Sequence, residues 1–339
     1  MLQVMVHGVG DTRLDEIPAP DPGPDDVVVR VAACGICGSD LSYIGMGGFC
    51  LSGGPMPLGH ELSGVVDWVG ADVQGTRVGD RVAVFPGNAQ DVGLDVIGNG
   101  APEGGLTSLL LVRDAGTRRG VYRIPDDLPL ETAALTEPVN VGMRGVNRTG
   151  ATTGEKVVVF GCGPVGLGAI ATLVDRNIEV VGVDLSARRL ELAGAIGASA
   201  VVNASETDVW EELIRLHGRE EIRGRVGPGT HAYVETSGSP VILAELVEKA
   251  RVGAAISVVA MHGQPVPTNF MAVMSKELEI RGSMGYPSRF EDGIDLLTRR
   301  DLSTIITHRV PLENFHDALG VLQGEKDCGK VLVTIGDLD

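Results

Sequence analysis

A thiol, an imidazole and a carboxylate of the kinds that bind Zn²⁺ occur close together in the chain. Cys37 lies in Gly35-Ile36-Cys37-Gly38-Ser39-Asp40, and His60 and Glu61 follow in Gly59-His60-Glu61. These ligand types hold zinc in catalytic sites that keep one coordination position open for substrate. A buried cysteine beside a hydrogen-bonded core histidine is the structural alternative, and residue type alone leaves it open.

A second set of residues has the spacing of a phosphate-binding turn. Gly161-Cys162-Gly163-Pro164-Val165-Gly166 has the pattern G-x-G-x-x-G, and it follows an apolar strand pattern over 157–160. The helix pattern 167–174 comes next, and a second strand, 179–183, ends at Asp184. The three glycines would permit the turn, the approach of a pyrophosphate and close helix packing, while the helix N-terminus attracts phosphate.

Asp184 stands where a carboxylate can accept both hydroxyls of an adenosine ribose. The segment therefore predicts a dinucleotide site, and a βαβ unit without a ligand is the alternative.

Composition excludes several classes of partner. The 339 residues include 28 Lys and Arg against 45 Asp and Glu, a net charge of −17, and only 4% are aromatic. Nucleic acid and anionic membranes are therefore not expected as partners. The N-terminus shows no signal peptide, and five cysteines, an odd number, do not form a disulfide framework, so a cytoplasmic location is predicted.

The strand and helix patterns predict an α/β protein of two domains. Turn-rich strands at 26–33, 62–70 and 78–84 predict a small β-rich barrel or sandwich over residues 1–138. Strands and helices then alternate through 139–288, which predicts a doubly wound parallel sheet. A helix at 289–298 and a strand at 330–335 return to the first domain, giving it the second range 289–339. The other expected elements of the second domain are helices 187–196, 208–217 and 241–249 and strands 200–202, 232–235 and 255–259.

Together with Val78-Gly79-Asp80-Arg81-Val82 and Glu137-Pro138, these motifs resemble the zinc-dependent medium-chain dehydrogenase/reductase family over essentially the whole chain. The resemblance is greatest to its sorbitol and butanediol dehydrogenase branch. It implies a GroES-like catalytic domain interrupted by a Rossmann domain, one catalytic zinc, NAD, a homodimer or homotetramer, and an alcohol or ketone substrate. The implied reaction transfers hydride between the alcohol and the nicotinamide, with zinc as Lewis acid.

The resemblance also implies roles for the metal-binding residues. Cys37 and His60 match zinc ligands, and Asp40 matches the acid that orients the ligating histidine. Glu61 matches the carboxylate ligand of the sorbitol branch, whereas Glu137 matches a third ligand of other members, so both carboxylates stay open.

Substrate and cofactor residues follow in the same way. Ser39 matches the hydroxyl that takes the substrate proton, and Tyr43 and Tyr286 match substrate contacts. The implied cofactor-binding residues are Gly161, Gly163, Pro164, Val165, Gly166, Asp184, Arg189 and Lys330, the last as a basic residue near the pyrophosphate. Asp184 favours NAD because a carboxylate repels a 2′-phosphate, while Arg188 and Arg189 leave NADP open.

The chain also departs from the family pattern. Residues 85–105 contain no cysteine, so the family's structural zinc is not expected. Ser42 replaces the histidine at the outer end of the proton relay, and Gly285 replaces an arginine, which disfavours a sugar alcohol. The apolar residues expected near the cleft favour a less polar alcohol or ketone: Met46, Phe49, Leu106 and Met284.

The predicted function is a zinc-dependent, NAD-dependent oxidoreductase of a secondary alcohol or diol. Two other functions stay open. A zinc-free quinone or enoyl reductase would share the fold without needing Cys37 and His60. A non-catalytic dinucleotide-binding protein would account for Ser42 at the relay position.

Overall fold

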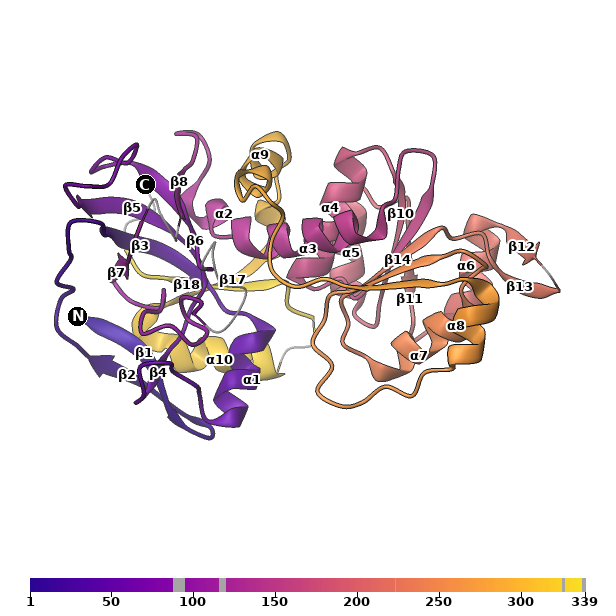
Figure 1. The fold of residues 1–339 in the computed structure, drawn as a ribbon, viewed down its shortest axis with the longest axis horizontal. Coiled ribbons are helices and arrows are strands. Elements are labelled where there is room, and N and C mark those ends of the chain that lie inside the picture. The colour runs from indigo at the N-terminus through magenta and orange to yellow at the C-terminus, as the bar shows by residue number, and fades with distance from the viewer. Residues whose placement is uncertain (88–94, 116–119, 223, 325–326, 337–339) are drawn as a thin grey trace. The chain divides into compact units, whose positions relative to one another are not determined.

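The computed structural model describes residues 1–87, 95–115, 120–222, 224–324 and 327–336. The chain divides into two units, Met1–Glu137 with Phe290–Asp339, and Pro138–Arg289 (Figure 1). Each observed boundary differs by one residue from the boundary expected from the sequence.

The first unit contains a seven-stranded sheet in the order β17-β18-β3-β5-β6-β8, with β7 also paired to β3. Its central strand β3 (Val27–Gly35) is buried at every position except Arg30, because β5, β18 and β7 all pair with it. The other strands are β5 (Glu61–Val69), β6 (Arg81–Phe85), β7 (Leu109–Val112), β8 (Gly120–Arg123), β17 (Ile306–Pro311) and β18 (Lys330–Thr334).

In the described residues, a smaller sheet and four α-helices complete this unit. The sheet has the order β2-β1-β4, formed by β1 (Leu2–Gly8), β2 (Asp11–Glu16) and β4 (Met56–Pro57). The helices are α1 (Gly38–Met46), α2 (Leu130–Ala133), α9 (Glu291–Arg299) and α10 (Phe315–Gly324). The strand expected over 78–84 begins only at Arg81, because Gly79 has φ 91° and the Asp80 carboxylate accepts the Arg77 N–H in a turn.

The second unit contains a six-stranded parallel sheet in the order β11-β10-β9-β14-β15-β16. This is the order of a doubly wound dinucleotide-binding fold, whose order reverses between β9 and β14. The predicted α/β fold class is therefore confirmed. The strands are β9 (Lys156–Phe160), β10 (Glu179–Asp184), β11 (Ala200–Asn203), β14 (Ala232–Glu235), β15 (Ala255–Val258) and β16 (Glu279–Gly282).

Helices cover this sheet, and its core is apolar and aromatic. Phe160, Trp210 and Tyr233 lie with ring centroids 5.9–6.3 Å apart. The helices are α3 (Thr136–Thr149), which starts at the end of the first unit, α4 (Pro164–Asp175), α5 (Ala187–Ile196), α6 (Val209–His217), α7 (Pro240–Lys249) and α8 (Phe270–Lys276). A hairpin of β12 (Arg219–Ile222) and β13 (Arg225–Pro228) was not expected, because the charged run Arg-Glu-Glu has no apolar alternation.

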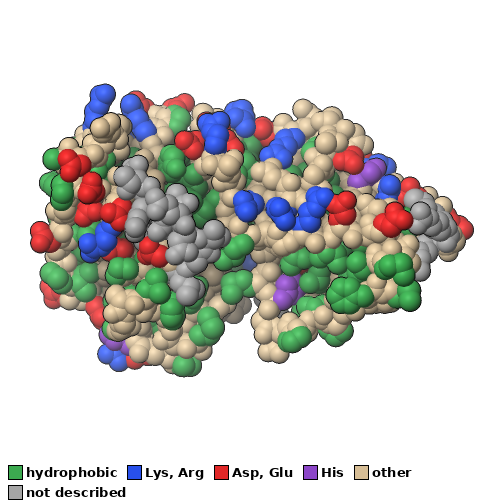
Figure 2. Space-filling model, in the orientation of Figure 1, with side chains coloured by type: hydrophobic (Ala, Val, Ile, Leu, Met, Phe, Trp, Pro, Cys, Tyr) green, Lys and Arg blue, Asp and Glu red, His purple; other side chains and the backbone are tan. Residues whose placement is uncertain are grey.

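The surface of the second unit carries exposed apolar side chains. Val241 on α7 and Phe270, Met271 and Met274 on α8 are each more than 60% exposed. Figure 2 shows hydrophobic side chains gathered over α7 and α8. Within the described residues, no helix is long and apolar enough to cross a membrane. The homo-oligomer expected from the resemblance stays a prediction.

Candidate functional site

Strand pairing brings the three candidate metal ligands together in the first unit. β3 leads into Cys37 just before α1, and His60 stands immediately before β5, which begins at Glu61. Because Gly35 pairs with Glu61 across β3 and β5, the two chain segments meet at this point. The Cys37, His60 and Glu61 ligand atoms all lie within 4.8 Å of one another. His60 and Glu61 are buried and Cys37 is half-buried, so a cation here would be largely shielded from water.

Asp40 lies beside this cluster, as the sequence predicted. Its Oδ2 accepts the Cys37 N–H at 2.8 Å, and its Oδ1 lies 3.5 Å from His60 Nδ1. Burial would lower the pKa of His60, but Asp40 and Cys37 together outweigh burial and raise that pKa well above its ordinary value. Binding of a cation through His60 would therefore release a proton.

Lys330 lies beside this cluster, and its predicted contact with the pyrophosphate stays a prediction. Its Nζ donates to Glu61 Oε1 at 2.7 Å, to Glu61 Oε2 at 2.5 Å and to Ile36 O at 3.0 Å. Burial would lower the pKa of Lys330, but the charges of Glu61 and Cys37 raise it. All three ammonium hydrogens thus have acceptors in the first unit.

The structure distinguishes between the two candidate carboxylate ligands. Among the described residues, Glu61 belongs to the three-ligand cluster and Glu137 does not. Glu137 is buried in the first turn of α3, and its charge contributes to the raised pKa of Lys330. Glu61 is therefore the candidate carboxylate that lies next to Cys37 and His60.

Helix α1 carries the predicted proton-transfer and substrate residues of the first unit. Ser39 Oγ is buried and has no hydrogen-bond partner among the described residues. Ser42 Oγ donates to Gly38 O at 3.4 Å near the surface, and Tyr43 is half-buried on the same helix. Tyr286 belongs to the second unit, where its carbonyl accepts from Arg144 Nη1 at 2.6 Å.

In the second unit, the three glycines of the glycine-rich turn differ in the space that a side chain would have. Gly161 has φ 91°, and a Cβ there would lie 2.8 Å from Ser237 N. A Cβ on Gly166 would collide with Gly161 O, whereas one on Gly163 would meet nothing within 4 Å. Pro164 starts helix α4 directly after Gly163. The open side of Gly163 therefore lies at the helix N-terminus, where a phosphate would bind.

Asp184 ends β10 next to this turn. Its Oδ2 accepts the Cys162 N–H at 2.6 Å, and its Oδ1 accepts the Ser186 N–H at 2.9 Å. These bonds fix the carboxylate, yet each oxygen keeps a second acceptor position for a ribose hydroxyl. Arg189 lies in the first turn of α5, where its N–H donates to the Ser186 cap at 3.1 Å.

The sequence missed a buried carboxylate that contacts an imidazole at the same end of this sheet. Glu235 ends β14 with 0% exposure, and its Oε2 lies 2.9 Å from Nε2 of His262, which follows β15. His262 was expected to be structural or solvated. The sequence did contain a signal for Glu235: it is an acid at the end of an expected strand, and the turn residues Thr236-Ser237-Gly238 follow it.

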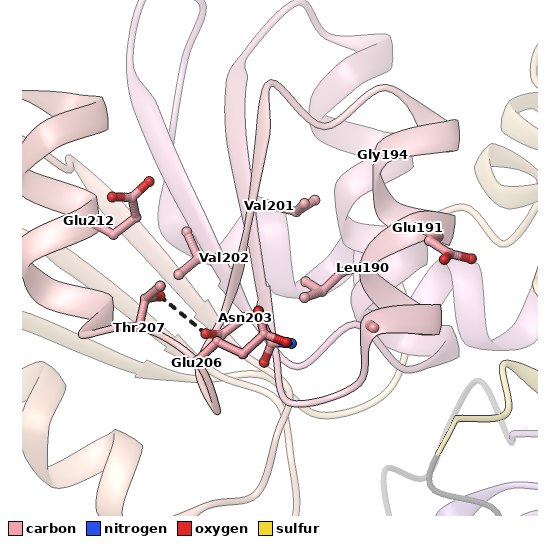
Figure 3. Close-up of a pocket in the computed structure, with 10 residues that line it drawn as sticks. Leu190, Glu191, Gly194, Val201, Val202, Asn203, Glu206, Thr207 and Glu212 are labelled. Atoms are coloured by element: carbon pink, nitrogen blue, oxygen red, sulfur yellow. Dashed lines mark hydrogen bonds between the residues drawn. The ribbon is translucent and has the colours of Figure 1, made fainter.

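A cavity of about 520 Å³ lies along the outer strand β11, between α5 and α6 (Figure 3). Its lining combines Leu190 and Val201 with Glu191 and Glu206. None of the predicted site residues lines it. We therefore assign it no part in the reaction.

Comparison with known proteins agrees with this architecture. The family model of the alcohol dehydrogenase GroES-like domain matches residues 23–126, and the zinc-binding dehydrogenase model matches residues 164–299. Sorbitol dehydrogenase from Homo sapiens is 32% identical, covering 94% of this chain and 91% of its own length. The (R,R)-butanediol dehydrogenase of Neisseria gonorrhoeae is 33% identical, covering 91% of each protein. The crystal structure of 2R,3R-butanediol dehydrogenase from Bacillus subtilis has a TM-score of 0.85 at 27% identity, covering 98% of this chain and 99% of that one.

Proposed function

The chain belongs to the zinc-type alcohol dehydrogenase family, and we propose that it is a zinc- and NAD-dependent enzyme that interconverts a secondary alcohol or diol and its ketone. Its relatives support the coarser assignment to alcohol or polyol oxidoreductases. The observation that carries the finer proposal is the buried cluster of Cys37, His60 and Glu61.

The donor set of this cluster fits zinc. Thiolate, imidazole and carboxylate are zinc ligands, and three protein ligands leave a fourth position for substrate. The buried Ser39 Oγ without a partner in the described chain is an orphaned polar atom on the helix that follows Cys37, which suits a group meant to bind substrate. Bound zinc would supply Lewis acidity that lowers the pKa of a substrate alcohol.

Ser39 would handle the substrate proton. A hydroxyl can accept a proton from the substrate oxygen while it donates its own, and its Oγ is not committed to another described residue. Ser42 lies three residues further along α1 and is exposed, so its hydroxyl or a water beside it would complete the path to solvent. This arrangement would replace the histidine relay expected from the resemblance.

The second unit would hold the dinucleotide. The open backbone at Gly163 and the N-terminus of α4 suit the pyrophosphate, and the fixed Asp184 carboxylate suits the ribose hydroxyls. The nicotinamide supplies the hydride acceptor or donor at its C4 atom. We favour NAD over NADP because Asp184 would repel a 2′-phosphate.

Two features support a less polar substrate than a sugar alcohol. Met46 on α1 and Phe49 just after it are 63% and 43% exposed, close in sequence to the proposed proton path. Gly285 supplies no side-chain donor for additional hydroxyls. A secondary alcohol or a short diol fits both observations.

The test combines metal analysis with an alcohol and ketone panel in the presence of NAD or NADP. We expect one zinc per chain and NADH formation with secondary alcohols or diols. Cys37→Ser should lose zinc and turnover but still bind NADH, whereas Cys50→Ser should keep both zinc and turnover, because Cys50 lies outside the cluster. Full activity in zinc-free Cys37→Ser would refute the zinc mechanism. Zinc-free wild-type protein that reduces quinones would favour the reductase alternative.

A further inference from the structure

The Glu235 carboxylate joins two segments at the carboxyl end of the parallel sheet, the turn after β14 and the segment after β15. Its Oε1 accepts from Ser237 N at 2.7 Å, Ser237 Oγ at 2.6 Å and Gly238 N at 2.9 Å. Its Oε2 lies 2.9 Å from His262 Nε2. The Glu235 carbonyl also accepts from Val259 N at 2.9 Å and Ala260 N at 3.1 Å. Glu235 therefore binds both its own turn and the segment that follows β15.

The turn after β14 also contacts the glycine-rich loop. Thr236 Oγ1 donates to Phe160 O at 2.9 Å and to Gly161 O at 2.7 Å. A larger residue would not fit at Gly161, because its Cβ would lie 2.8 Å from Ser237 N. Hydrogen bonds thus connect the segments after β9, β14 and β15, and His262 supplies a side-chain contact between the last two.

Sheet topology indicates which half of a dinucleotide this surface would meet. In a doubly wound sheet the ligand crosses the carboxyl ends of the strands where the strand order reverses, here between β9 and β14. Asp184 on β10 marks the adenosine side. β14 and β15 lie on the opposite side of β9, which is the side left for the nicotinamide half.

We infer that His262 is a positioning residue for the nicotinamide half of the cofactor. It acts through Glu235, by holding the segment Val259–Gly263 in place at the end of β15. His262 Nδ1 is buried, so His262 does not itself offer this nitrogen to the ligand. With Nε2 donating to Glu235, the imidazole satisfies one lone pair of a carboxylate that is fully buried. Loss of that donor would leave the carboxylate under-satisfied and would release the segment.

This inference rests on the proposed function, and the experiment separates the two. NADH and ADP are titrated by fluorescence and calorimetry against zinc-loaded wild type, His262→Ala, His262→Gln and His262→Asn. ADP lacks the nicotinamide and its ribose, so it reports only the adenosine half and the glycine-rich turn. His231→Gln is the matched control, because His231 directly precedes β14 and so lies at the amino end of this strand, whereas His262 lies beyond the carboxyl end of β15.

We expect His262→Ala to weaken NADH binding about tenfold, the loss of one bond to a buried charge, with ADP binding changed by less than about twofold. His262→Gln should restore NADH binding because its amide can donate to Glu235, whereas the shorter His262→Asn should not. His231→Gln should bind both ligands like wild type.

NADH binding by His262→Ala equal to that of wild type would overturn the inference. An equal loss of NADH and ADP would also overturn it, since that result marks a general structural role. If His262→Ala does not fold, the comparison of His262→Gln with His262→Asn decides between the same outcomes. Wild-type protein that binds neither NADH nor NADPH would instead refute the proposed function.

Discussion

Replacing Lys330 by methionine tests the charge balance of the metal cluster. Lys330 is 2% exposed and Glu61 is 1% exposed, and the ammonium donates to both carboxylate oxygens, at 2.5 and 2.7 Å. Methionine has a similar length and no charge. Lys330→Met therefore leaves the Glu61 carboxylate buried without its cationic partner.

The expected cost is large in the metal-free protein. Removing one partner of a buried ion pair destabilises a protein by about 3–5 kcal/mol. At about 2–4 °C per kcal/mol for a unit of this size, the melting temperature should fall by about 6–20 °C. Bound zinc would replace the lost positive charge beside Glu61, so zinc should restore much of the stability. Zinc affinity should rise, because Lys330 no longer competes for the carboxylate.

The assay is a melting curve of wild type and Lys330→Met, each with a chelator and with one equivalent of zinc. Lys276→Met is the control: Lys276 is 4% exposed and donates to the carbonyls of Val247, Glu248 and Ala250 in the second unit. It should be destabilised to the same extent with and without zinc. Equal stability of metal-free Lys330→Met and wild type would refute the role of this ion pair, and so would equal responses of both variants to zinc.

Two further predictions concern the second unit. Asp184→Asn keeps an oxygen acceptor for the Cys162 N–H but removes the charge, so the ratio of NADPH affinity to NADH affinity should rise about tenfold. An unchanged ratio in binding titrations would show that Asp184 does not contact the ribose. Burial, with help from the positive charges of Lys156 and His231, lowers the pKa of His217 to about 4 from its ordinary 6.5. The unfolded chain then takes up the proton first, so His217 destabilises the fold as the pH falls from 6.5 towards 4. Melting temperatures between pH 7.5 and 5 should fall less steeply in His217→Gln than in wild type, and parallel slopes would contradict this assignment.

Local signals were sufficient to predict much of the second unit. The helix 187–196 has its expected bounds because Ser186 caps its start, where its hydroxyl accepts the Arg189 N–H, and Gly197 ends it with φ 112°. The strand 232–235 is likewise as predicted, since its apolar run lies between turn residues. The glycine-rich turn and its following acid were recognisable because both depend on residues close in sequence.

Contacts between distant segments could not be predicted in the same way. Lys330 and Glu61 are separated by 269 positions, and the pairing of β18 with β3 that brings them together depends on tertiary packing. From the sequence alone Lys330 is only a basic residue, and a basic residue fits a pyrophosphate as well as a carboxylate. Glu235 and His262 meet for a similar reason, since parallel strands β14 and β15 align their carboxyl ends. By contrast, Cys37, His60 and Glu61 could be named as candidate ligands because each stands in a short motif that resembles the family pattern, although residue type alone left the structural alternative open.

The discontinuous first unit constrains the order in which the protein can mature on the ribosome. The second unit is one uninterrupted stretch, Pro138–Arg289, so it can fold while the remaining residues are still being synthesised. The first unit must wait, because β18 inserts between β17 and β3 and brings Lys330 to Glu61. Until that last strand emerges, the nascent Glu61 lacks its cationic partner, so completion of the buried Lys330–Glu61 pair is expected to be a late, post-translational event.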